Sequence, residues 1–128
     1  MMDVYIVDDC AEIAQMIRIV LEIEGYEAAW ARHGDEALAW LHTQECAPAL
    51  LLVDLTMPGM DGATFIRQAM ALPQLRDTHI AVMTADAAPA AKLRGLPISA
   101  ILHKPFDLDD LLDIVENVIA PMRLATAA

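Results

Sequence analysis

The sequence has little basic charge. Eight Lys and Arg residues stand against nineteen Asp and Glu residues, which gives a net charge of −11. Proteins that bind nucleic acids neutralise phosphates with lysine and arginine, so we expect no direct contact with nucleic acid. The acidic balance fits protein partners that have basic surfaces, or simply solubility.

Cysteines and long apolar runs are also scarce. Cys10 and Cys46 are the only cysteines, and their spacing matches neither a zinc site nor a redox motif. No apolar run approaches the roughly 20 residues that a membrane-spanning helix needs. The opening residues Met1-Met2-Asp3 do not form the basic start of a signal peptide. We therefore predict a cytoplasmic protein with reduced thiols and no membrane insertion.

The chain is nevertheless rich in hydrophobic residues, which make up 57% of its 128 positions. That length fits one domain, and it allows about two-thirds of the unfolded chain's surface to be buried without metal or disulfide support. We assign residues 1–120 to this domain and residues 121–128 to a short C-terminal tail.

Apolar runs of strand length alternate with helical patterns along the chain. The predicted strands span residues 3–7, 26–31, 50–53, 80–83 and 98–103. Four fuller helices are predicted: 13–23 before Gly25, a second after Gly34, a third from Asp61 to about residue 72, and a last one from Asp107 to residue 120. A shorter helix follows Pro89 and ends near Gly95.

This alternation predicts a doubly wound α/β fold. Strands separated by helices pair in parallel through right-handed crossovers. Strands that are apolar throughout are typical of sheets that helices cover on both faces. We expect one (βα)₅ domain with a five-stranded parallel sheet, and Pro121 should end the last helix.

Polar residues follow several of these strands. Asp8 and Asp9 come after the first strand, Asp54 after the third, Thr84 after the fourth and Lys104 after the fifth. Ligands of parallel α/β sheets bind at the carboxyl edge of the strands, so these side chains should lie near one another.

The three aspartates predict a Mg²⁺ site, because clustered carboxylates need a cation and Mg²⁺ prefers oxygen ligands. Calcium is less favoured because no loop has alternating acidic positions, and zinc would need several His or Cys ligands. A carboxylate such as Asp54 can also attack phosphorus. Lys104 and Thr84 could then contact phosphoryl oxygens.

The sequence resembles the receiver domain of two-component response regulators, from Asp3 to about Ile119. Four motifs carry this resemblance: Val7-Asp8-Asp9, residues 54–62 (Asp-Leu-Thr-Met-Pro-Gly-Met-Asp-Gly), Thr84-Ala85 and Lys104-Pro105-Phe106. The resemblance implies a flavodoxin-like fold with strand order 2-1-3-4-5. It also implies a signalling phosphoacceptor of the stand-alone type rather than an enzyme.

The resemblance also implies roles for individual residues. Asp54 would accept a phosphoryl group from a sensor histidine kinase or phosphotransfer protein, and Lys104 and Thr84 would contact that group. Asp8, Asp9, Asp54 and the backbone carbonyl of Thr56 would hold Mg²⁺. Phosphorylation would then change a surface that binds a downstream protein target. A weak homodimer is a further option.

Two positions depart from the family pattern. The family usually has Tyr or Phe three residues before the lysine, as the switch partner of the threonine, but this chain has Ile101. The segment between Thr84 and Lys104 also has room for only about two helical turns, which are marginal without tertiary support. Both departures fall on the family's usual output surface.

Three other interpretations remain open. A degenerate receiver would bind its partner without phosphorylation. A phosphatase of the haloacid dehalogenase type would need a second Asp at position 56, where this chain has Thr56. A flavin-binding flavodoxin-like protein would need a phosphate-binding loop rich in Ser, Thr and Gly after the first strand.

Overall fold

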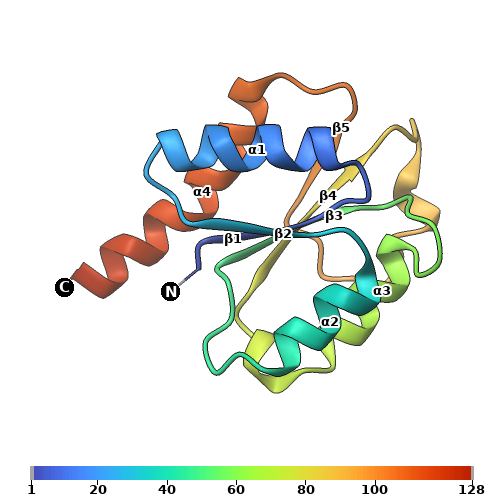
Figure 1. The fold of residues 1–128 in the computed structure, drawn as a ribbon, viewed down its shortest axis with the longest axis horizontal. Helices are drawn as coiled ribbons and strands as arrows, with labels where there is room; N and C mark the ends of the chain where they lie inside the picture. Colours follow the sequence, from blue (N-terminus) through green and yellow to red (C-terminus); the bar gives the residue numbers. More distant parts are fainter. Residues whose placement is uncertain (1, 128) are drawn as a thin grey trace.

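The structure is a computed structural model that describes residues 2–127, with side-chain surroundings described for residues 2–122. Its centre is a parallel sheet of five strands in the order β2-β1-β3-β4-β5, as predicted (Figure 1). The strands are β1 (Val4–Val7), β2 (Ala28–Ala31), β3 (Leu50–Asp54), β4 (His79–Thr84) and β5 (Ala100–His103).

Four α-helices cover the sheet. Helices α1 (Ala11–Ile23) and α4 (Leu108–Ala127) lie on one face, and α2 (Gly34–His42) and α3 (Gly62–Met70) lie on the other (Figure 1). Two short 3₁₀ helices complete the fold, η1 (Pro73–Leu75) and η2 (Pro89–Ala91). None of the helices within residues 2–127 has the length and apolar character needed to cross a membrane.

The sheet separates two hydrophobic cores. Tyr5 and Val7 of β1 contribute to the core beneath α2 and α3, whereas Val4 and Ile6 contribute to the core beneath α1 and α4. Side chains of a strand alternate between its faces, so a strand covered on both sides must be apolar throughout. This explains why every residue of β1 is apolar and buried.

The structure corrects the predicted helix after Pro89. Only the 3₁₀ helix η2 forms there, so residues 2–127 contain four α-helices rather than the five expected of (βα)₅. Pro89 opens the turn, and Gly95 adopts a left-handed conformation with φ of +78°. The segment between Pro89 and Gly95 forms too few helical hydrogen bonds to offset the free-energy cost of nucleating an α-helix.

The end of the last helix is also corrected. We expected Pro121 to stop it at residue 120, but α4 continues to Ala127 and includes most of the predicted tail. Residue 128 lies outside the described residues. A proline inside a helix removes one hydrogen bond and costs about 3 kcal/mol. Ile119 before Pro121 is buried and Met122 after it packs on the same core, and these contacts hold the helical path.

Strands β2 and β5 each begin two residues later than predicted. β2 starts at Ala28 because the backbone N–H of Tyr26 donates to the carbonyl of Leu21 at the end of α1. β5 starts at Ala100 because the N–H of Ile98 donates to the carbonyl of Leu96 in a tight turn. In both places a local turn uses the donor that would otherwise join the sheet.

Candidate functional site

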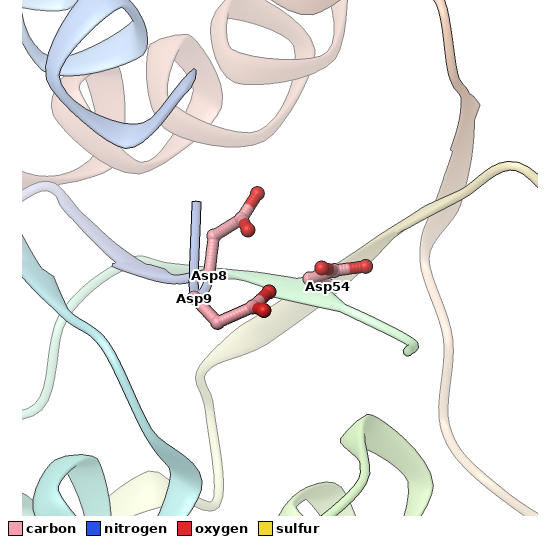
Figure 2. Close-up of side chains that lie close together, drawn as sticks. All are labelled: Asp8, Asp9 and Asp54. Atoms are coloured by element: carbon pink, nitrogen blue, oxygen red, sulfur yellow. The ribbon is translucent and has the colours of Figure 1, made fainter. Parts of the chain in front are cut away.

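The carboxylates of Asp8, Asp9 and Asp54 gather at the carboxyl edge of the sheet (Figure 2). One carboxylate oxygen from each lies within 4.8 Å of the others. Asp54 is the last residue of β3, while Asp8 and Asp9 follow β1, its direct neighbour in the sheet. Parallel pairing of β1 with β3 therefore brings the three predicted residues together.

A close backbone approach supports this edge. A Cβ atom placed on Gly62 would lie only 2.5 Å from the backbone oxygen of Asp54 and 2.7 Å from the Cα of Leu55. Only glycine lets the first turn of α3 lie this close to the end of β3. Asp61 then caps α3, since its side chain accepts a hydrogen bond from the N–H of Thr64 at 2.8 Å, as predicted.

Asp8 is fully buried and held from several directions. Its Oδ1 accepts a hydrogen bond from the N–H of Cys10 at 2.9 Å, and its Oδ2 lies 3.1 Å from Nζ of Lys104. Its backbone carbonyl accepts a hydrogen bond from Nε1 of Trp30 at 2.8 Å. These contacts fix both the side chain and the backbone from which Asp9 projects.

Lys104 joins the two buried aspartates. Its Nζ lies 3.1 Å from Asp8 and 3.5 Å from Asp54, and the side chain is mostly shielded from solvent. Burial alone would lower the pKa of Lys104, but the charges of both carboxylates outweigh it and the pKa is raised. The lysine therefore stays positively charged at the site.

The single lysine does not neutralise the cluster. Burial, and next the negative charge of Asp8, raise the pKa of Asp54 from 3.8 to about 6, although Lys104 and the N–H of Thr56 act in the opposite direction. Ionisation of Asp54 in the folded protein is therefore unfavourable unless a second cation binds beside it. Asp9 is exposed to solvent, which gives that cation a path to the site.

The donor set fits Mg²⁺. It offers carboxylate oxygens on one side and access for water on the other, as Mg²⁺ requires. Asp8, Asp9 and Asp54 would hold the ion by their carboxylates. The backbone N–H of Thr56 donates to Oδ1 of Asp54 at 3.2 Å. The role of the Thr56 carbonyl as a ligand of Mg²⁺ remains a prediction.

Thr84 ends β4 beside the acidic residues and is almost completely buried. Its hydroxyl oxygen accepts a hydrogen bond from the N–H of Asp86 at 3.0 Å, which leaves the hydroxyl proton free to donate elsewhere. Its backbone carbonyl accepts from the N–H of Lys104 at 2.7 Å. The hydroxyl and the lysine are thus linked through the ends of neighbouring strands.

Ile101 does not belong to this cluster. It lies in β5 opposite Val82, on the face of the sheet that α2 and α3 cover, and its side chain is 40% exposed. It contributes no polar group to the carboxylates. The structure therefore separates the predicted input residues from the atypical switch position.

Trp30 contacts the candidate site, and the sequence did not reveal this contact. We expected Trp30 only to pack, yet its indole N–H positions the backbone of Asp8, and the Arg32 guanidinium lies 5.7 Å from its ring centroid. Its place in β2, directly beside β1, was the available signal. A tryptophan near the end of the strand next to an acidic pair can reach the turn that carries that pair.

Comparisons with known proteins agree with this geometry. A family model described as the response regulator receiver domain matches residues 4–116. The chain is 30% identical over 116 residues to the phosphate regulon transcriptional regulatory protein PhoB of Rhizobium meliloti. The matched segment covers 89% of this chain and 50% of that protein. It is 35% identical over 105 residues to the transcriptional regulatory protein ResD of Bacillus subtilis, covering 80% and 42%. The chain thus spans about half the length of these curated relatives.

Solved structures give the same picture. Chemotaxis response regulator CheY4 of Vibrio cholerae superposes with a TM-score of 0.83 at 30% identity, covering 92% of this chain and 98% of that one. Response regulator TrrA of Thermotoga maritima, solved in complex with Mg²⁺–BeF, has a TM-score of 0.79 at 26% identity, covering 92% and 99%.

Proposed function

Because the chain belongs to the family of response regulator receiver domains, which are signalling phosphoacceptors, we propose that Asp54 accepts a phosphoryl group in the presence of Mg²⁺. The donor would be the phosphohistidine of a sensor histidine kinase or phosphotransfer protein. The observation that carries this proposal is the position of Asp54, next to two further carboxylates and 3.5 Å from Nζ of Lys104.

The transfer is a displacement at phosphorus. A carboxylate oxygen of Asp54 forms the new O–P bond, the P–N bond of the phosphohistidine breaks, and the imidazole leaves with the bonding electrons. Mg²⁺, when bound, offsets the charge of the carboxylates and of the incoming phosphoryl oxygens. Lys104 supplies a second positive charge, next to both Asp8 and Asp54.

Thr84 completes the proposed site. Its hydroxyl oxygen already accepts the N–H of Asp86, so its proton can be donated to a phosphoryl oxygen. A phosphoryl group brings a charge of about −1.5 to −2. Reorientation of Thr84 toward that charge would move residues 85–88 and alter the surface that a downstream protein target contacts.

The similarity to TrrA supports the choice of Mg²⁺, since that receiver was solved with Mg²⁺–BeF and shares the fold. The donor set points the same way, because three carboxylates and exposure at Asp9 match what Mg²⁺ binds. Ile101 concerns only the surface that would bind a downstream target, because it is not among the residues that would carry out the phosphoryl transfer.

A phosphorylation assay with a matched control tests the proposal. The protein is incubated with acetyl phosphate and Mg²⁺, and intact mass reports the addition of a phosphoryl group. The label should disappear in Asp54→Asn and in the presence of EDTA. The label should persist in Asp61→Asn, because Asp61 is not one of the three clustered aspartates. Asp61 is exposed at the start of α3, and asparagine caps a helix equally well.

Labelling of Asp54→Asn that survives alkali and hydroxylamine would contradict the proposal, because both reagents cleave acyl phosphates and the label would then be on another residue type. The degenerate-receiver alternative predicts a different result. In that case a downstream partner would bind wild type and Asp54→Asn equally, with or without Mg²⁺.

A further inference from the structure

The outer edge of the sheet at β5 is open to pairing. Within the described residues, β5 pairs only with β4. The N–H of Lys104, directly after β5, donates to the carbonyl of Thr84 at 2.7 Å, so it faces β4. Backbone groups alternate in direction along a strand, so those of Ala100 and Leu102 also face β4, whereas those of Ile101 and His103 face away from it. A strand edge of this kind is a template for another extended chain.

A hollow borders this edge on the side of η2. It has a volume of about 390 Å³ and lies where a longer helix after Pro89 would cover the sheet. Ile101 projects toward this side and remains 40% exposed. The hollow is mainly apolar and is lined by Ala90, Leu93, Leu96, Ile98, Ser99, Ala100 and Ile101.

A second hollow borders the same edge on the side of α4. It has a volume of about 440 Å³ and shares Ile101 with the first. Its wall includes the exposed side chains of Asp110 and Asp113. Among residues 2–122, neither carboxylate takes part in an ion pair. The two sides of the strand edge thus differ in chemistry, one apolar and one acidic.

We propose that β5 binds an extended segment of a partner protein in which apolar residues alternate with basic residues. Side chains of an added strand point alternately to the two faces of the sheet. One set would enter the apolar hollow beside Ile101, and the other would face Asp110 and Asp113. Main-chain hydrogen bonds to Ile101 and His103 would supply the pairing. This site goes beyond the phosphoryl-acceptor function and does not depend on it.

Charge complementarity selects this occupant over a second copy of the chain. Two copies joined edge to edge would bring two sets of acidic α4 residues together, and each copy carries a net charge of −11. Like charges placed across an interface are unfavourable. β5 itself contains no lysine or proline, the residues that commonly protect an edge strand. The acidic wall therefore repels acidic segments and admits basic ones.

The test uses a capped octapeptide of alternating valine and lysine, titrated into ¹⁵N-labelled protein without Mg²⁺ at physiological salt. Amide shifts should concentrate on residues 98–104 and on the first turns of α4. Three control peptides separate the contributions. One groups the valines and lysines into two blocks, one replaces lysine with glutamate, and one carries N-methyl groups on alternate residues. All three should bind at least several-fold more weakly.

Protein variants provide the matched comparison. Ile101→Lys should weaken binding about tenfold by losing apolar contact and adding like charge. Asp110→Asn with Asp113→Asn should weaken it several-fold, in a salt-dependent manner. Ile23→Lys is the control, because Ile23 is also an exposed isoleucine, at 77%, but lies at the end of α1. Labelling of Asp54 by acetyl phosphate should be unchanged in all of these variants.

Several outcomes would overturn the proposal. Equal binding of the blocked peptide, or shifts spread over other acidic surfaces, would indicate nonspecific attraction. Tight binding that ignores N-methylation would indicate a docked helix instead of an added strand. Shifts of residues 98–104 with protein concentration alone would indicate a second copy. Failure of peptide binding with intact labelling of Asp54 would refute the β5 site and leave the proposed function standing.

Discussion

Asp54→Asn should stabilise the metal-free protein while removing the proposed phosphoryl acceptor. Burial and the Asp8 carboxylate raise the pKa of Asp54 from 3.8 to about 6, so the folded protein favours the neutral side chain. That rise corresponds to about 3 kcal/mol, at about 1.36 kcal/mol for each pH unit. Asparagine is neutral and nearly the same shape. We expect the free energy of unfolding near neutral pH to increase by about 1–3 kcal/mol.

The pH dependence fixes the sign of this effect. Between the unfolded pKa of 3.8 and the folded pKa of about 6, the folded protein binds more protons at Asp54 than the unfolded chain does. The stability contributed by protonation is fully present below 3.8 and is lost as the pH rises through about 6. The advantage of Asp54→Asn should therefore vanish at the acidic end of this interval and be complete above it.

Urea unfolding followed by circular dichroism in EDTA measures the difference directly. Adding Mg²⁺ should stabilise the wild type by mass action and the variant much less, so the gap should narrow or reverse. Asp61→Asn is the control, because the N–H of Thr64 lowers the pKa of Asp61 and neutralisation there should bring no gain. A variant at position 54 no more stable than wild type in EDTA, or a pH-independent gap, would refute the reasoning.

Further predictions concern the metal, the lysine and the backbone of the site. Trp30→Phe removes the hydrogen bond to Asp8 and should weaken Mg²⁺ several-fold by calorimetry, whereas Trp40→Phe in the opposite core should not. Mg²⁺ affinity should fall about tenfold for each pH unit below about 6, and a flat profile would contradict the raised pKa of Asp54. Lys104→Met should slow labelling by acetyl phosphate roughly a hundredfold while Mg²⁺ still binds. Gly62→Ala should lower the free energy of unfolding by about 1–3 kcal/mol, since its Cβ would meet backbone atoms that cannot move aside.

The site could be predicted from the sequence because its residues stand at strand ends. Asp8, Asp54, Thr84 and Lys104 each end or follow an apolar run, and parallel strands deliver their carboxyl ends to one edge. This inference needs only the strand pattern. The side-chain contacts that the structure adds, such as Lys104 with both buried aspartates, follow from that shared edge.

Other features depend on tertiary packing, which no local pattern reveals. The hydrogen bond from Trp30 to Asp8 depends on the side-by-side register of β1 and β2. The continuation of α4 past Pro121 depends on Met122 reaching the core. For the segment after Pro89 the sequence predicted a short helix, marginal without tertiary support, and the structure has only a 3₁₀ helix there. Only one 3₁₀ turn forms because the free energy of helix nucleation is not offset by packing against the rest of the protein. Composition alone does not give the size of that packing contribution.

The ion pair between Lys104 and Asp8 has a consequence for how the protein matures. It joins side chains separated by 96 positions, one near each end of the sheet-forming sequence. During synthesis the chain emerges from its N-terminus, so Asp8 and Asp54 leave the ribosome long before Lys104 does. Until β5 docks beside β4, the two buried aspartates lack their cationic partner. On the proposed function, a chain whose β5 has not yet docked would accept a phosphoryl group only slowly, so full reactivity would come with the last strand.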